Sequence, residues 1–264
     1  MKTRSDIFFK SFFISLIVFS LIAVLIISSM YIERAFVDPT KRESNIVIGI
    51  TLDDDLLCLC VLNCNPKSKE VTYLPIPDNL ILEDGRILQK SYNKKMPRSL
   101  LSTINDLSGA YINKYLFISI DGVTAINDKL GGFEFLIRYP FEHNGETQSG
   151  NTYMTGEMAK SMFSYNGYDM TKVSLSDMGL AYLTSLLSSF SDSNSLFVSL
   201  SDTYISSCIN TDITEAEMLE YSKLFSKYGD MSHRFLELEG DKRPTSSNLY
   251  FIPQNYKTNK KIFK

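Results

Sequence analysis

Asp78 and Asn79, in the stretch YLPIPDNL (73–80), are the first candidates for chemistry in this sequence. They follow Pro75 and Pro77, and proline cannot donate a hydrogen bond to a sheet, so a strand is expected to end here. Ligand sites of α/β domains lie at such strand ends. Aspartate and asparagine after proline are also ordinary turn residues. Two interpretations stay open: a part of a ligand site, or a turn alone.

Cysteine is the second residue type that could do chemistry. The four cysteines are Cys58, Cys60, Cys64 and Cys208. The first three share parity, so on a strand their side chains face one side and do not pair readily with each other. No C-x-x-C spacing or nearby histidine supports a metal site. We expect the first three to be buried free thiols, and the redox state of all four stays open.

An uncharged apolar run, SFFISLIVFSLIAVLIISS, covers residues 11–29. As a helix it spans about 28 Å, close to the hydrocarbon thickness of a bilayer, and no convincing small-residue cleavage site follows it. The charged residues before it are Lys2, Arg4, Asp6 and Lys10. This basic flank favours an uncleaved anchor at 11–30 over a buried core helix, with residues 1–10 in the cytoplasm and the rest outside the cell membrane.

The exported part of the chain is weakly acidic. Without residues 1–30, which hold three basic residues and one acidic residue, 24 basic and 29 acidic side chains remain, a net charge of −5. Such a balance does not attract nucleic acid through bulk charge, so no nucleic-acid partner is expected. A phosphate site would need a local basic pocket.

Strands and helices alternate after a polar linker at 31–44, which predicts one mixed α/β domain at 45–255, followed by a tail at 256–264. The predicted strands cover 45–51, 56–63, 71–76, 115–121 and 133–140, with short strands in the last segment. The predicted helices cover 98–109, 122–132, 156–165, 176–190 and 214–227. Residues 141–152 are predicted to be a polar loop and 196–205 to be extended. Thr214 and Glu217 have the spacing of a capping box.

Four stretches in order resemble the LytR-CpsA-Psr (LCP) family. They are NPKSKEVTYLPIP (65–77), YLFISIDGVTAINDKLGGFEFLI (115–137), YMTGEMAKSMF (153–163) and NTDITEAEMLEYSKLF (210–225). The resemblance covers about residues 45–255, behind a lone N-terminal anchor. It implies a mixed central sheet flanked by helices on both sides. It also implies an extracytoplasmic protein of a Gram-positive cell envelope.

Members of this family resemble transferases that move a glycopolymer, such as teichoic acid or capsule, from a polyprenyl pyrophosphate carrier onto peptidoglycan. The resemblance implies a hydrophobic groove that holds the lipid. It also implies magnesium and arginines that bind the pyrophosphate, where negative charge develops during transfer. In this chain the groove could be lined by apolar side chains that could equally be plain core. These are Phe133, Phe135, Phe163, Leu180, Leu183 and Leu187.

The sequence departs from the family pattern at the cations. The family's Ile-Pro-Arg-Asp motif falls on 76–79, where Asp78 and Asn79 follow Ile76-Pro77. The two arginine-bearing motifs of the family fall on 163–166 and 171–175, where Lys172 is the one remaining cation. At the position of the aspartate that lies beside the metal in the family, this sequence has Leu57. These losses predict little turnover, because each missing charge-assisted contact in a transfer site costs about 2–4 kcal/mol.

Three functions remain open on these residues. The first is a catalytically degenerate member that binds a lipid, a glycan or a protein partner such as an active relative. The second is an active transferase with a rearranged site, in which Asp53, Asp54 and Asp55 hold magnesium, while Arg86, Arg98 and Lys172 partly replace the missing arginines. The third is a sensor or scaffold. For the three aspartates a solvated turn is the plainer interpretation.

Overall fold

The structure is a computed structural model. It describes Ser20, Val24, Ser28 and residues 43–53, 55–112, 114–191, 203–225, 227–245 and 248–255. The chain divides into two compact units, Met1–Asp38 and Pro39–Lys264, and every element below belongs to the second. None of the described helices combines the length and the apolar character needed to cross a membrane. The predicted anchor at 11–30 lies outside the described residues, apart from three isolated positions.

A six-stranded mixed sheet forms the centre of this unit, in the order β7-β4-β1-β2-β3-β8. The strands are β1 (Ser44–Leu52), β2 (Asp55–Asn65), β3 (Glu70–Ile76), β4 (Lys114–Ser119), β7 (Ile209–Thr211) and β8 (Ser232–Phe235). β1 runs antiparallel to β2 and parallel to β4, and β3 runs antiparallel to β2 and parallel to β8. The prediction of a mixed α/β fold is confirmed.

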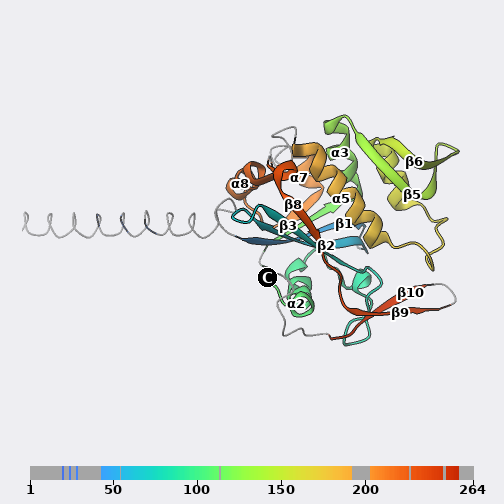
Figure 1. Cartoon of the computed structure of the whole chain (residues 1–264), viewed down its shortest axis with the longest axis horizontal. Coiled ribbons are helices and arrows are strands. Elements are labelled where there is room, and N and C mark those ends of the chain that lie inside the picture. Colours follow the sequence, from blue (N-terminus) through green and yellow to red (C-terminus); the bar gives the residue numbers. More distant parts are fainter. Residues whose placement is uncertain are drawn as a thin grey trace, which may run out of the picture. The chain divides into compact units, whose positions relative to one another are not determined.

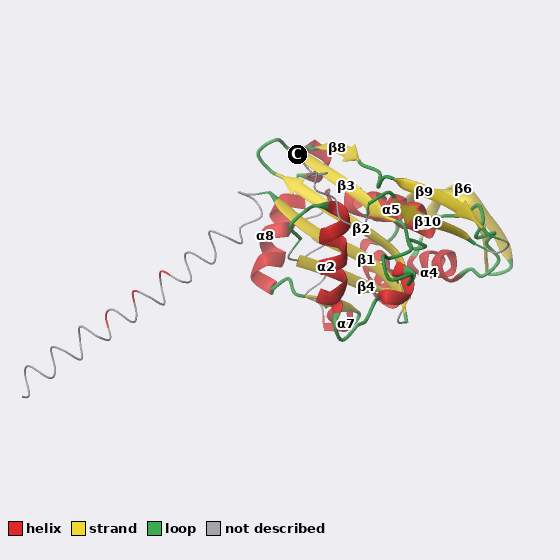
Figure 2. Cartoon of the chain, turned by 90° about the horizontal axis from the view of Figure 1, so that it is seen from below, coloured by secondary structure: helices red, strands yellow, loops and turns green. Residues whose placement is uncertain are grey.

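Helices cover both faces of the sheet (Figures 1 and 2). On one face lie the 3-10 helix η1 (Leu88–Ser91) and α2 (Pro97–Ser108), which pack on one hydrophobic core. The other face is covered by α3 (Ile120–Leu130), α4 (Gly156–Ser164), α5 (Leu175–Ser191), α7 (Thr203–Ser207) and α8 (Glu215–Phe225). Side chains alternate between the two cores along β2, because successive residues of a strand point to opposite faces.

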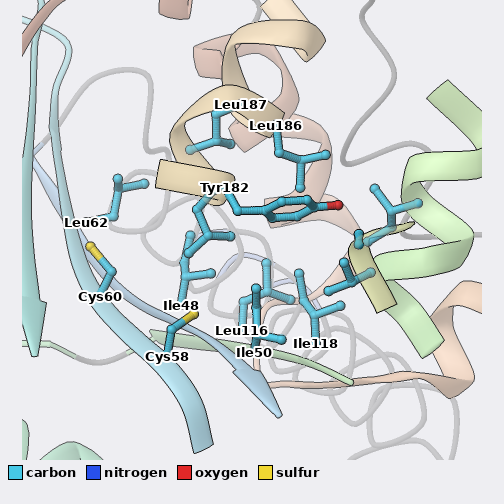
Figure 3. Close-up of a cluster of buried hydrophobic side chains, with 14 of the residues drawn as sticks. Ile48, Ile50, Cys58, Cys60, Leu62, Leu116, Ile118, Tyr182, Leu186 and Leu187 are labelled. Carbon is cyan, nitrogen blue, oxygen red and sulfur yellow. The ribbon is translucent and has the colours of Figure 1, made fainter. Parts of the chain in front are cut away.

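The longest described helix, α5, packs directly against the middle of the sheet. Figure 3 shows Tyr182, Leu186 and Leu187 of α5 facing side chains that rise from the strands. Tyr182 is fully buried, and its ring lies 5.3 Å from the rings of both Phe133 and Phe163. This aromatic cluster fixes the position of α5 and of the chain that leads into it.

Cys58, Cys60 and Cys64 face the α5 side of the sheet as buried free thiols, which confirms the prediction from their parity. Burial raises the pKa of Cys58 and of Cys64 to about 12, and it raises the pKa of Cys60 as well. They therefore stay protonated at neutral pH and do not supply the thiolates that metal ions bind. Cys208 is also a free thiol, but it is only partly buried.

Helix ends follow the predicted signals. Gly109 ends α2 in the left-handed conformation, with φ of 63°. At the start of α8 the capping box is formed: the backbone N–H of Thr214 donates to Glu217 Oε2 at 2.8 Å, and the backbone N–H of Glu217 donates to Thr214 Oγ1 at 3.4 Å.

Two predictions about local structure were wrong. Residues 141–152 are not a polar loop: β5 (Phe133–His143) and β6 (Glu146–Met154) form a hairpin whose turn residues, Asn144 and Gly145, both have positive φ. Asn-Gly is a strong hairpin signal that the sequence contained. In the stretch predicted to be extended at 196–205, the described residues 203–205 belong to the helix α7. The last segment also contains the 3-10 helix η2 (Tyr228–Asp230) and a second hairpin, of β9 (Gly240–Pro244) and β10 (Leu249–Pro253).

Candidate functional site

The turn after β3 lies beneath the first turn of α5. Leu80 N donates to Pro77 O, so Asp78 and Asn79 occupy a turn, as one of the two sequence interpretations proposed. The Asp78 side chain does not face solvent, since only 6% of the residue is exposed. Asp78 N donates to Ser176 Oγ at 2.8 Å, and this hydroxyl lies 3.0 Å from both Ile76 O and Asp78 Oδ1.

Burial raises the pKa of Asp78 and so favours its protonated form. The Ser176 hydroxyl and the backbone N–H groups of Asp78, Ser176 and Asn79 hydrogen-bond to the carboxylate and oppose that shift without cancelling it. The Ser176 hydroxyl has one proton, so it cannot fully satisfy the Ile76 carbonyl and the Asp78 carboxylate at once.

Asn79 has a structural role in the same turn. Its side-chain amide donates to the carbonyl of Leu249, and its backbone carbonyl accepts from Phe251 N at 3.2 Å. Both partners belong to β10, so Asn79 ties the β9–β10 hairpin to the end of β3.

A cavity of about 470 Å³, with a mixed polar and apolar lining, begins one residue beyond Ser176. Its walls come from β5, from α5, from Met162 of α4 and from Phe235 of β8. Its lining side chains are Phe135, Leu136, Ile137, Arg138, Tyr139, Met162, Asp177, Met178, Leu180, Ala181, Thr184, Ser185 and Phe235. Two charged groups, Arg138 and Asp177, sit among otherwise apolar and hydroxyl side chains. Such a lining suits a ligand that has both an apolar and a polar part.

Of the six side chains that the sequence offered for a groove, Phe135 and Leu180 line this cavity. Phe133, Phe163, Leu183 and Leu187 are buried in the core instead. Arg138 and Ser176 were not among the site residues predicted from the sequence. Arg138 could have been found from β5, where Glu134, Leu136 and Arg138 alternate with three buried apolar residues.

The candidate cations do not converge on the cavity. Arg86 pairs with Asp84 at 2.6 Å and Arg98 with Asp212 at 3.3 Å, both on the α2 side of the sheet. Lys172 precedes α5 and pairs with Asp169 at 2.7 Å, which holds the pKa of Asp169 at about 2. None of the three lines the cavity.

The candidate magnesium ligands Asp53 and Asp55 do not line the cavity either. Asp53 lies in the β1–β2 turn with φ of 53°, and Asp55 forms an ion pair with Lys90. Asp54 lies outside the described residues. Nowhere in the described ranges do three histidine, cysteine, aspartate or glutamate side chains gather as metal ligands. A magnesium role for Asp53, Asp54 and Asp55 stays a prediction.

The variant Asp78→Asn tests the environment of this carboxyl. A group whose pKa is raised on folding contributes stability that is fully present below the unfolded pKa, 3.8, and is lost as pH rises through the folded pKa. Asparagine keeps the hydrogen-bonding shape without the charge. The variant is expected to be more stable than the parent at pH 7, and the gain should shrink towards pH 4. Urea unfolding at pH 7, 5.5 and 4 measures this, and a gain independent of pH would contradict it.

Comparisons with known proteins agree with this architecture. The model of the LytR_cpsA_psr family matches residues 58–263. B. subtilis TagV is 19% identical over 81% of this chain and 92% of its own, with a TM-score of 0.65. B. subtilis TagT is 14% identical over 82% of this chain and 86% of its own, with a TM-score of 0.60. The structure of TagT bound to LI-WTA has a TM-score of 0.63 at 12% identity, over 82% and 87% of the two chains.

No curated protein matches the chain. The solved structures share its fold, and the family model covers more than three quarters of its length. The chain belongs to the LytR_cpsA_psr family.

Proposed function

We propose that this protein is a membrane-anchored, extracytoplasmic component of the bacterial cell envelope that binds a lipid-linked glycopolymer without transferring it. Residues 11–30 would serve as the anchor, with the N-terminus in the cytoplasm. Membership of the LytR_cpsA_psr family supports an envelope role, and the structure of TagT with LI-WTA supports a glycopolymer as the ligand class.

The observation that carries the proposal is the cavity between β5 and α5. Its apolar walls suit a hydrocarbon chain, and Arg138 is suited to hold a phosphate at the end of that chain. Arg138 forms no ion pair with any carboxylate in the described part of the chain. The guanidinium is therefore available to a ligand.

The loss of transfer activity is inferred from the cations. Phosphoryl transfer needs positive charge where negative charge develops. Here Arg86, Arg98 and Lys172 are each paired with an aspartate away from the cavity. Asp78 is buried, and the sequence resemblance implies that it replaces an arginine of the family. One cation in the cavity is suited to binding and insufficient for the family reaction.

An active transferase with a rearranged site is the second candidate, and Arg138 is the observation that favours it. Both functions are tested by titrating the detergent-solubilised full chain with a short-chain polyprenyl pyrophosphate in a calorimeter, with and without magnesium. We expect binding that magnesium does not change. Magnesium-dependent binding together with release of the lipid pyrophosphate in the presence of peptidoglycan would favour the transferase. Absence of binding would leave a scaffold.

The variant Arg138→Gln tests the role of the guanidinium. A charge-assisted contact contributes about 1.5–3 kcal/mol, so affinity for the polyprenyl pyrophosphate is expected to fall roughly tenfold to a hundredfold. Affinity for the matching uncharged polyprenol should stay the same. Arg86→Gln removes an exposed arginine outside the cavity and is the matched control. Equal weakening for both lipids would show that Arg138 supports the cavity wall and does not bind phosphate.

A further inference from the structure

The cavity between β5 and α5 is lined by two charged side chains of opposite sign, Arg138 and Asp177. Within the described ranges, neither side chain has a hydrogen-bond or ion-pair partner, and the two do not pair with each other. Lys172, which precedes α5, is engaged by Asp169 and does not line the cavity. The lining therefore has no net charge, but it contains one positive and one negative group that are both available.

The two charged groups come from opposite walls of the cavity. Arg138 lies in the irregular part of the β5–β6 pairing that follows Ile137, and such irregularities re-aim side chains next to sites. On α5, Asp177, Ala181 and Ser185 follow one another at intervals of four residues, so they form one stripe along the helix, and all three line the cavity. A ligand between strand and helix would therefore meet both charges.

A structural role accounts for only part of the behaviour of Asp177. It lies in the first turn of α5, where the helix dipole favours negative charge. Ser174 and Asp177 have the spacing of a capping box, and Asp177 N donates to Ser174 Oγ at 3.1 Å. The second half of the box is not formed, because no donor in the described part of the chain binds the Asp177 carboxylate. This carboxylate is exposed and open to a ligand.

We propose that the ligand of this cavity is zwitterionic, with an ammonium group that Asp177 binds and a phosphate that Arg138 binds. Arg138 holds the phosphate in the proposed function, on which this assignment rests. A carboxylate in the same cavity repels a phosphate ligand that has no cation of its own, and it attracts one that carries an ammonium group. Two sources share this chemistry: an amino sugar on a lipid-linked glycan, and the aminoalkyl phosphate head group of a phospholipid.

Two pairs of lipids that differ only in the charge of one amine test the proposal and separate the sources. The first pair is the farnesyl phosphodiester of glucosamine and its N-acetylated form. The second is dihexanoyl phosphatidylethanolamine and its N-acetylated form. Each lipid is titrated into the detergent-solubilised full chain in a calorimeter. In at least one pair the amine should bind roughly threefold to tenfold more tightly, between the values for an exposed and a desolvated charge contact. The pair that shows the preference identifies the source.

Three variants locate the preference. Asp177→Asn should abolish it, so that both members of a pair bind alike, whereas Arg138→Gln should weaken both members and keep it. Glu157→Gln is the matched control, because Glu157 is an exposed carboxylate in the first turn of α4 and does not line the cavity. It should leave the preference unchanged.

Two results would overturn the zwitterionic assignment while leaving the proposed function intact. One is equal binding within both pairs by the parent protein, and the other is a preference that survives in Asp177→Asn. Absence of binding by all four lipids would contradict the proposed function as well.

Discussion

Ala181→Phe is expected to weaken the binding of a polyprenyl chain about a hundredfold while leaving the protein folded. Ala181 lies on α5 and lines the cavity between α5 and β5. It is only partly buried, so a ring at this position can enter the cavity without displacing the core beneath it. Occluding about 100 Å² of apolar contact removes roughly 2.5–3 kcal/mol of binding free energy, a hundredfold in Kd.

The control for this variant is Ser188→Phe, which adds the same ring to an exposed position of the same helix outside the cavity. Calorimetric titration of both variants with the same lipid gives the comparison, and thermal unfolding checks that each is folded. Normal binding by a folded Ala181→Phe would place the ligand elsewhere and remove the main support for the proposed function.

The order of strands and helices along the chain could be predicted, because the hydrophobic patterns of the segments that form the core are strong. Cys58, Cys60 and Cys64 share parity and face one core, and Gly109 and the Thr214–Glu217 box mark helix ends. These signals are local, and each reports on the few residues around it. The β5–β6 hairpin was missed although its Asn144-Gly145 turn was visible, because the polar strand β6 was taken for a loop.

The candidate site was predicted less well, for a different physical reason. Asp78 and Asn79 were placed correctly after a strand, but their environment depends on partners far along the chain. Ser176 buries Asp78 across 98 residues, and Leu249 binds Asn79 across 170. No local pattern encodes such contacts. The place of Arg138 beside the cavity could not be found from the sequence, because it follows from the packing of β5 against α5, which only the fold reveals.

Gly179→Ala is expected to lower the free energy of unfolding by about 1–3 kcal/mol, although alanine is the better helix former. A Cβ added at Gly179 would lie 2.2 Å from Cys58 Cβ and 2.3 Å from Cys58 Sγ. Carbon atoms in contact are separated by about 3.5–4.0 Å, so helix and strand would have to move apart. Tyr182, fully buried one turn later, and the central position of β2 resist that movement.

Urea unfolding of Gly179→Ala, Cys58→Gly and the double variant tests this contact directly. If the steric conflict is the cause, the double variant should be more stable than the sum of the single effects predicts, because Cys58→Gly removes both opposing atoms. Ser188→Ala, on the exposed face of the same helix, should change stability by less than about 0.5 kcal/mol. Additive effects in the cycle would mean that α5 does not approach β2 this closely. The cavity wall that α5 supplies would then also be misplaced, and the binding site proposed between α5 and β5 would lose its geometric basis.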